Sequence, residues 1–216
     1  MADLIDFEMV RHVRGYELVE SGPKKAATGP ATRLLAPRGP FLIPKGKAVE
    51  TYRPLEGFPA LFRELADLRK EPPAILKFAN RFGLLSLPKE SPRSIREDVS
   101  DWYELIDRMR EAIEARERQE WWRLTSESAL FGRADIRLVA PQGDAPARIK
   151  IVPWSLRSAL WIQFATATAA NARLKACEQC GKWFQHGTGT GRRKTARFCA
   201  DACRKAWHLD HQEVAR

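Results

Sequence analysis

Residues 177–203 read CEQCGKWFQHGTGTGRRKTARFCADAC, and this stretch decides the fold of the C-terminal part of the chain. It contains all four cysteines of the sequence, in two close pairs: Cys177 and Cys180, then Cys199 and Cys203. Four thiols in two close pairs favour one tetrahedral Zn2+ ion in a chain from a reducing compartment. Because four thiolates leave no open coordination position, we expect the zinc to be structural.

The compartment is inferred from the rest of the sequence. The first six residues, MADLID, are acidic where a signal peptide would be basic, and no apolar segment follows them. No run of 18 apolar residues exists in the 216-residue chain, so no membrane-spanning helix is expected. We therefore expect a cytoplasmic protein that does not bind membranes. A homodimer is possible, but nothing in the sequence decides the oligomeric state.

Other uses of the cysteines stay open. A disulfide pair is disfavoured because disulfides are rare in the cytosol. A redox dithiol needs only one pair, and an iron–sulfur cluster usually has a more compact spacing. His186, His208 or His211 could replace a cysteine as a ligand, but with four thiols present we expect these histidines at the surface.

The residues around the cysteines predict a knuckle, a β-hairpin and a helix. Gly181 follows the first pair and permits the left-handed backbone of a zinc knuckle. The hairpin is expected to begin at residues 183–184 and to return over residues 195–198. The second cysteine pair lies at the start of a helix that is expected from about residue 200 towards residue 209, where its two side chains share one face. This order is that of a treble-clef zinc finger.

The sequence upstream of the finger predicts a mainly helical domain. Apolar residues recur at helical spacing. The pair Pro72-Pro73 is expected to end one helix and to begin the next, and Gly83 is expected to end that second helix. Ser94 and Glu97 are typical of the capping box of a long amphipathic helix. The apolar stripe of that helix, either core or dimer face, consists of Val99, Trp102, Ile106, Met109 and Ile113.

A β-hairpin and a second long helix follow. Apolar residues alternate on both sides of a turn within residues 136–152, which indicates a hairpin. Ser155 then caps a helix of about 20 residues, which we expect to be the central buried helix and to run straight into the first cysteine pair. The pair Trp121-Trp122 is expected in the core or in an interface.

The N-terminal segment is interrupted by glycine and proline and is expected to be irregular. Short strands are possible at residues 14–20 and 48–53, and a mobile loop is expected over residues 21–46. The predicted fold class is α+β, mainly α with a small β-hairpin and a C-terminal treble-clef finger. The predicted units are an irregular segment over residues 1–54, a mainly helical domain over 55–172 and a four-cysteine zinc finger over 173–212.

Positive charge is concentrated at the C-terminal end. The formal net charge is +10, and residues 171–216 carry ten Lys or Arg against four Asp or Glu. Such a segment suits DNA, RNA or an acidic protein, or is simply a solvated surface. Phosphate contacts need cations on a rigid support. The candidate nucleic-acid-binding residues are Lys182, Arg192, Arg193, Lys194, Arg197, Arg204 and Lys205.

Residues 177–184 and 197–206 resemble the C-terminal zinc finger of bacterial regulator-like proteins, most nearly the CGNR-type zinc finger family. The resemblance covers residues 155–209. It implies zinc binding, a helical N-terminal domain, and a role in DNA binding and transcription regulation. Phe198 precedes the third cysteine, as an aromatic residue does in that family. The chain departs from the family where Arg204-Lys205-Ala206 replaces Gly-Asn-Arg, where the last cysteine pair is closer, and where the loop between the pairs is longer.

No enzyme is expected. The sequence has no glycine-rich phosphate loop, no HExxH and no recognisable nucleophile elbow. His186 and His208 lie where treble-clef nucleases carry catalytic histidines, but no ligand set for a second metal accompanies them. We expect a cytoplasmic DNA-binding transcription regulator. The alternative is a zinc-stapled protein-interaction or structural module that does not bind nucleic acid.

Overall fold

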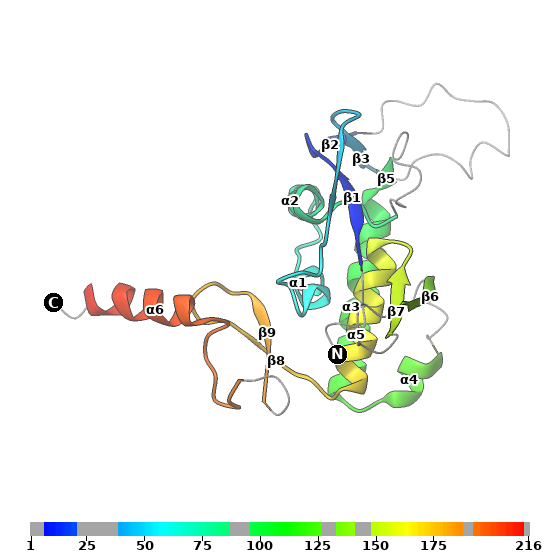
Figure 1. Cartoon of the computed structure of the whole chain (residues 1–216). Coiled ribbons are helices and arrows are strands. Elements are labelled where there is room, and N and C mark those ends of the chain that lie inside the picture. Colours follow the sequence, from blue (N-terminus) through cyan, green and yellow to red (C-terminus); the bar gives the residue numbers. More distant parts are fainter. Residues whose placement is uncertain are drawn as a thin grey trace, which may run out of the picture.

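The computed structural model describes residues 7–20, 39–86, 96–126, 133–140, 148–187 and 192–213. Within these residues the chain forms helices and small antiparallel sheets, as the α+β prediction requires (Figure 1). The elements in chain order are β1 (Met9–His12), β2 (Tyr16–Val19), β3 (Phe41–Pro44), β4 (Val49–Tyr52), α1 (Leu61–Ala66), α2 (Pro72–Phe82), β5 (Glu97–Asp98), α3 (Val99–Glu117), α4 (Trp121–Ser126), β6 (Ala134–Val139), β7 (Arg148–Pro153), α5 (Leu156–Ala169), β8 (Arg173–Ala176), β9 (Trp183–His186) and α6 (Asp201–Glu213).

The N-terminal strands form two sheets. β1 pairs with β4, and β3 lies between β2 and β5. The strands expected within residues 14–20 and 48–53 are confirmed as β2 and β4. The expected loop over residues 21–46 is wrong at Phe41–Pro44, where the apolar run Phe-Leu-Ile pairs with two strands and fully buries Leu42. Residues 21–38 of that predicted loop lie outside the described part of the chain.

The helical core follows the sequence pattern closely. Pro72 and Pro73 open α2, and Gly83 ends it with a left-handed φ of 77°. All five residues of the predicted apolar stripe of α3 are buried in the core, together with side chains from α1, α2 and α5. The alternative that this stripe forms a dimer face is therefore wrong, because the chain itself covers it.

The predicted capping box is wrong. Asp98 is the N-cap of α3, and its side chain accepts a hydrogen bond from Ser100 N at 2.8 Å. Ser94 lies outside the described residues. Glu97 is buried and accepts hydrogen bonds from two backbone N–H groups, Leu85 N at 2.9 Å and Ser86 N at 2.8 Å. The Glu97 carboxylate thus accepts hydrogen bonds from residues 85–86 and does not cap α3.

α5 is the central buried helix, as predicted. Ser155 caps it by accepting from Ser158 N, and the amide of Gln163 joins α5 to the start of α1 through Phe58 O and Phe62 N. The helix is shorter than expected, because Asn171 adopts a left-handed φ of 48° directly after the C-cap. The prediction that α5 runs straight into the first cysteine pair is wrong, since β8 lies between α5 and Cys177.

The β6–β7 hairpin is confirmed, with Ile136 opposite Ile151. Of the two expectations for Trp121 and Trp122, the core is wrong, because both side chains, on the short helix α4, are more than half exposed. Their place in an interface with another chain stays a prediction. Among the described residues, no helix has both the length and the apolar character needed to cross a membrane.

We predict that Glu97 makes stability depend on pH. Burial raises the pKa of Glu97 above its ordinary value of 4.5, although the backbone N–H groups of Leu85 and Ser86 act in the opposite direction. The folded state therefore binds this proton more tightly than the unfolded state, and its stabilising effect is lost as the pH rises through the raised pKa. The free energy of unfolding of the wild type should accordingly fall, relative to Glu97→Gln, as the pH rises above 4.5.

Urea unfolding of both proteins at several values between about pH 4.5 and 7.5 checks this prediction. Glu111→Gln removes an exposed carboxylate from the following helix, α3, and serves as the control for loss of charge. A difference between wild type and Glu97→Gln that is independent of pH, or that grows in favour of the wild type, contradicts the prediction.

Candidate metal centre

The first cysteine pair lies in the turn of a β-hairpin. β8 and β9 are antiparallel, with Ala176 opposite Trp183. The turn is closed by hydrogen bonds from Cys177 N to Lys182 O and from Gly181 N to Cys177 O, both at 2.9 Å. Gly181 has a φ of 71°, which a residue with a Cβ adopts only at a cost. The sequence therefore forms the predicted knuckle, with both sulfurs on one side of a tight turn.

The second cysteine pair lies at the start of α6. Cys199 precedes this helix and Cys203 is in its first turn. The loop before the helix is held to the knuckle by a hydrogen bond from Glu178 N to Arg197 O at 3.1 Å. The expected return strand over residues 195–198 is wrong: β9 pairs with the preceding strand β8, and only an isolated bridge joins Gly187 to Arg192.

The four sulfur atoms converge. The Sγ atoms of Cys177, Cys180, Cys199 and Cys203 all lie within 4.8 Å of one another. The distances from Cys199 Sγ to Cys180 Sγ and to Cys203 Sγ are both 3.5 Å. Tetrahedral coordination with Zn–S bonds of about 2.3 Å places sulfurs about 3.8 Å apart. The cluster therefore has the donor type, number and spacing to hold one metal ion, and zinc fits these donors best.

Backbone N–H groups lower the pKa of one of the four thiols, which favours metal binding. Burial alone would raise the pKa of the Cys177 thiol, but backbone N–H groups of Cys199, Cys180 and Gln179 outweigh it and lower the pKa from 9.0 to about 6. The N–H of Cys199 lies 3.3 Å from Cys177 Sγ. Burial and the neighbouring thiols raise the pKa of Cys199. The site therefore offers the Cys177 thiolate readily, whereas a bound cation would favour ionisation of Cys199.

Charged and aromatic side chains brace this centre. The guanidinium of Arg197 pairs with the carboxylate of Glu178 at 2.5 Å and lies 4.7 Å from the ring centroid of Trp207. Trp207 in turn stacks on His211. In the part of the chain that the structure describes, no histidine belongs to the sulfur cluster. This agrees with the expectation that the four thiols suffice.

Four of the seven predicted nucleic-acid contacts have partners within the chain. Arg197 pairs with Glu178 as above, and Arg204 lies 3.3 Å from Asp201. The guanidinium of Arg192 donates to Cys199 O at 2.7 Å, and the ammonium of Lys182 lies 4.4 Å from the ring centroid of Phe58. In contrast, Arg193, Lys194 and Lys205 are exposed, and their side chains form no ion pair with the described residues.

The finger is attached to the helical body through β9. Trp183 Nε1 donates to Asp67 Oδ2 at 2.7 Å, and the guanidinium of Arg63 lies 5.0 Å from the Trp183 ring centroid. Phe184 is fully buried. No local sequence pattern predicts the roles of Arg63 and Asp67, because their partner Trp183 lies more than 100 positions away.

Comparison of the chain with protein-family models, with curated proteins and with solved structures gives no match. The resemblance of residues 155–209 to the CGNR-type finger is thus not supported by a family match.

We predict that the wild-type chain binds about one zinc ion and that Cys180→Ser does not, because three thiolates with a hydroxyl form a much weaker site. Zinc content after dialysis, measured by atomic emission, and the thermal unfolding of the C-terminal region check this prediction. His208→Gln is the matched control, since it removes from α6 a side chain of a type that can bind zinc but that lies outside the cluster. Full zinc retention with unchanged unfolding in Cys180→Ser contradicts the assignment.

Proposed function

We propose that this chain is a zinc-stapled nucleic-acid-binding protein, with DNA as the favoured partner, and that it acts as a transcription regulator without a catalytic role. The observation that carries the proposal is the set of exposed cations Arg193, Lys194 and Lys205, none of which has an ion-pair partner among the described residues. These cations lie beside a four-cysteine centre that fits one metal ion.

In this proposal zinc supplies rigidity. Cys177 and Cys180 belong to the hairpin, and Cys199 and Cys203 belong to the start of α6, so one ion joins the two parts of the finger. The order of knuckle, strand and helix supports a treble-clef type of finger. Phosphate contacts gain from such a rigid support, because less side-chain and backbone freedom is lost on binding.

The shape of the finger supports the same proposal. α6 projects away from the helical body, beyond β8 and β9 (Figure 1). Its 13 residues correspond to a length of about 20 Å. The major groove of DNA admits an α-helix. Arg204, Lys205 and His208 are exposed on α6.

A protein-interaction module is the second candidate. The favouring observation is the apolar surface of the β6–β7 hairpin, where Ile136 is 77%, Leu138 75% and Ile149 57% exposed. Leu138 lies opposite Ile149 in the pairing register, so these side chains are neighbours on one face. Exposed apolar groups that cluster in this way are typical of contact surfaces.

The two candidates differ in their response to loss of charge. We predict that Arg193→Gln, Lys194→Gln and Lys205→Gln combined weaken binding to duplex DNA. The slope of log K against log salt should become shallower by about 0.9 for each phosphate that the variant no longer neutralises. Fluorescence anisotropy of the zinc-loaded protein with labelled duplex at about 50 to 200 mM salt measures both effects.

A matched variant controls for net charge. Lys45→Gln, Lys47→Gln and Lys77→Gln remove three exposed cations from the body and should leave the affinity and the salt slope close to those of the wild type. Equal weakening in both triple variants would assign the effect to net charge alone. No binding by the wild type at the lower salt concentration would favour the protein-interaction module.

A further inference from the structure

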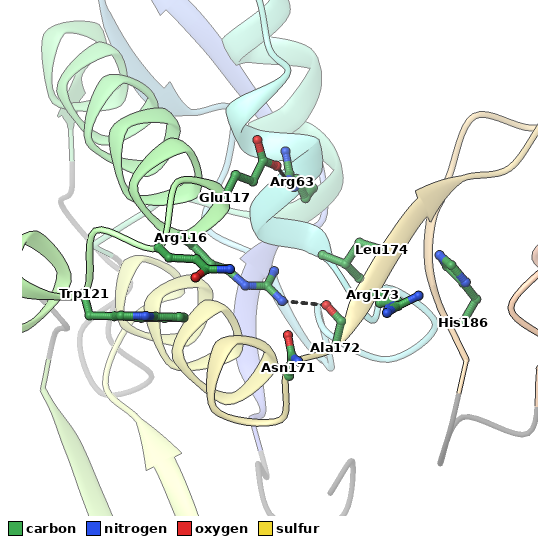
Figure 2. A pocket seen from close by; sticks show the side chains of 10 residues that line it. Arg63, Arg116, Glu117, Trp121, Asn171, Ala172, Arg173, Leu174 and His186 are labelled. Carbon is green, nitrogen blue, oxygen red and sulfur yellow. Dashed lines mark hydrogen bonds and ion pairs between the residues drawn. The ribbon is translucent and has the colours of Figure 1, made fainter.

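A cavity of about 460 Å³ lies where the helical body meets the hairpin of the finger. Arg63 of α1 and Arg116 of α3 line it from the body, and Arg173 of β8 and His186 of β9 line it from the finger (Figure 2). Its volume is within the range of small-molecule sites in proteins. Neither the metal centre nor the exposed cations of the finger make use of it.

The lining of this cavity carries an excess of positive charge. Three guanidinium groups, those of Arg63, Arg116 and Arg173, face one carboxylate, that of Glu117. Glu117 is paired with Arg63. The C-terminal ends of α3 and α5 border the cavity and contribute partial negative charge of about half a unit each. A net positive charge remains after both contributions.

The arginines differ in how they are engaged. Arg116 donates to Ala172 O at 2.6 Å, so it also holds the segment that follows α5, as the dashed line in Figure 2 marks. Burial, followed by the nearby guanidinium of Arg63, lowers the pKa of Arg116. Arg173 is exposed, and its side chain forms no ion pair with the described residues. The cavity therefore holds cations that its own acidic group does not neutralise.

Two buried nitrogens of the lining residues have no hydrogen-bond partner among the described residues. They are Arg63 Nε and His186 Nδ1. Buried polar groups of proteins are nearly always hydrogen-bonded, and exceptions call for an explanation such as a bound ligand. One of these nitrogens belongs to the body and the other to the finger. Polar groups without a partner among the described residues thus belong to lining residues on both sides of the cavity.

We infer that this cavity binds a small organic dianion, a phosphate monoester or a dicarboxylate, through the guanidinium groups of Arg63, Arg116 and Arg173. Guanidinium groups match the oxygens of both anions in geometry and charge. Trp121, on the side opposite His186 in Figure 2, offers an aromatic surface to the organic part of the ligand. Such a ligand contacts the body and the finger together and fixes the hairpin against α1 and α3. This inference does not depend on nucleic-acid binding.

Calorimetric titration of the zinc-loaded full chain tests the inference. The probes are inorganic phosphate, adenosine monophosphate and succinate, with sodium chloride at matched ionic strength as the control. Saturable binding of adenosine monophosphate or of succinate, without a comparable chloride effect, is the expected result. The stronger of the two identifies the ligand as a phosphate ester or as a dicarboxylate.

Arg173→Gln is the decisive variant, because Arg173 is exposed and its loss leaves the core intact. It should weaken binding of the better probe by about tenfold, the effect expected of one charge-assisted hydrogen bond. Arg69→Gln, which changes an exposed arginine of the body outside the cavity, should bind the probe as the wild type does. Both variants should keep the zinc content and the unfolding temperature of the wild type.

Hydrogen exchange locates the bound probe. Added ligand should protect backbone amides of β8, β9 and the last turn of α3, and this protection should disappear in Arg173→Gln. The inference is overturned if none of the three probes binds saturably at up to about 10 mM. It is equally overturned if Arg173→Gln and Arg69→Gln weaken binding by the same factor.

Discussion

The convergence of four thiols is the constraint on which the C-terminal part of this protein depends. Their sulfurs lie within 4.8 Å of one another, so four thiolates at this spacing would repel one another strongly without a cation between them. The pKa of Cys177 is lowered, whereas that of Cys199 is raised, in part by the charge of Cys177. A divalent metal removes it, because it binds all four thiolates and displaces their protons. The geometry of the knuckle, the loop and the start of α6 is therefore coupled to metal binding.

The remaining interactions of the finger explain why it needs such a staple. None of residues 201–211 of α6 is fully buried: Leu209 is exposed, and the partly buried Trp207 contacts Arg197, Phe198 and His211. The finger joins the body through β9, where Phe184 is buried and Trp183 meets Asp67 and Arg63. A helix with so little apolar packing gains little from the hydrophobic effect, so a metal ion held by the four cysteines would stabilise its position.

Local patterns in the sequence predicted the parts of this structure that depend on neighbouring residues. The proline pair before α2, Gly83 after it, Ser155 at the start of α5 and the spacing of the cysteines act within a few positions, and the structure follows each of them. Interactions between distant segments escaped prediction. The local pattern predicted that Glu97 is part of a helix cap. Its hydrogen-bond partners, the backbone N–H groups of Leu85 and Ser86, are identified only in the folded structure. The pairing of β9 with β8 displaced the expected return strand for the same reason, because pairing registers are decided by tertiary packing.

The net charge of the finger overstates the number of its cations that are available to contact a polyanion. Of the seven cations predicted to contact phosphate, Lys182, Arg192, Arg197 and Arg204 already have partners within the chain. If the three others each contact one phosphate of duplex DNA, the salt slope is about −2.7, which is small beside that of tight DNA-binding proteins. Three such contacts support weak, sequence-independent binding by a single finger. Tight binding then requires a second source of contacts, either another copy of the chain or a surface of the helical body, and the length of DNA that is needed for full affinity separates these two arrangements.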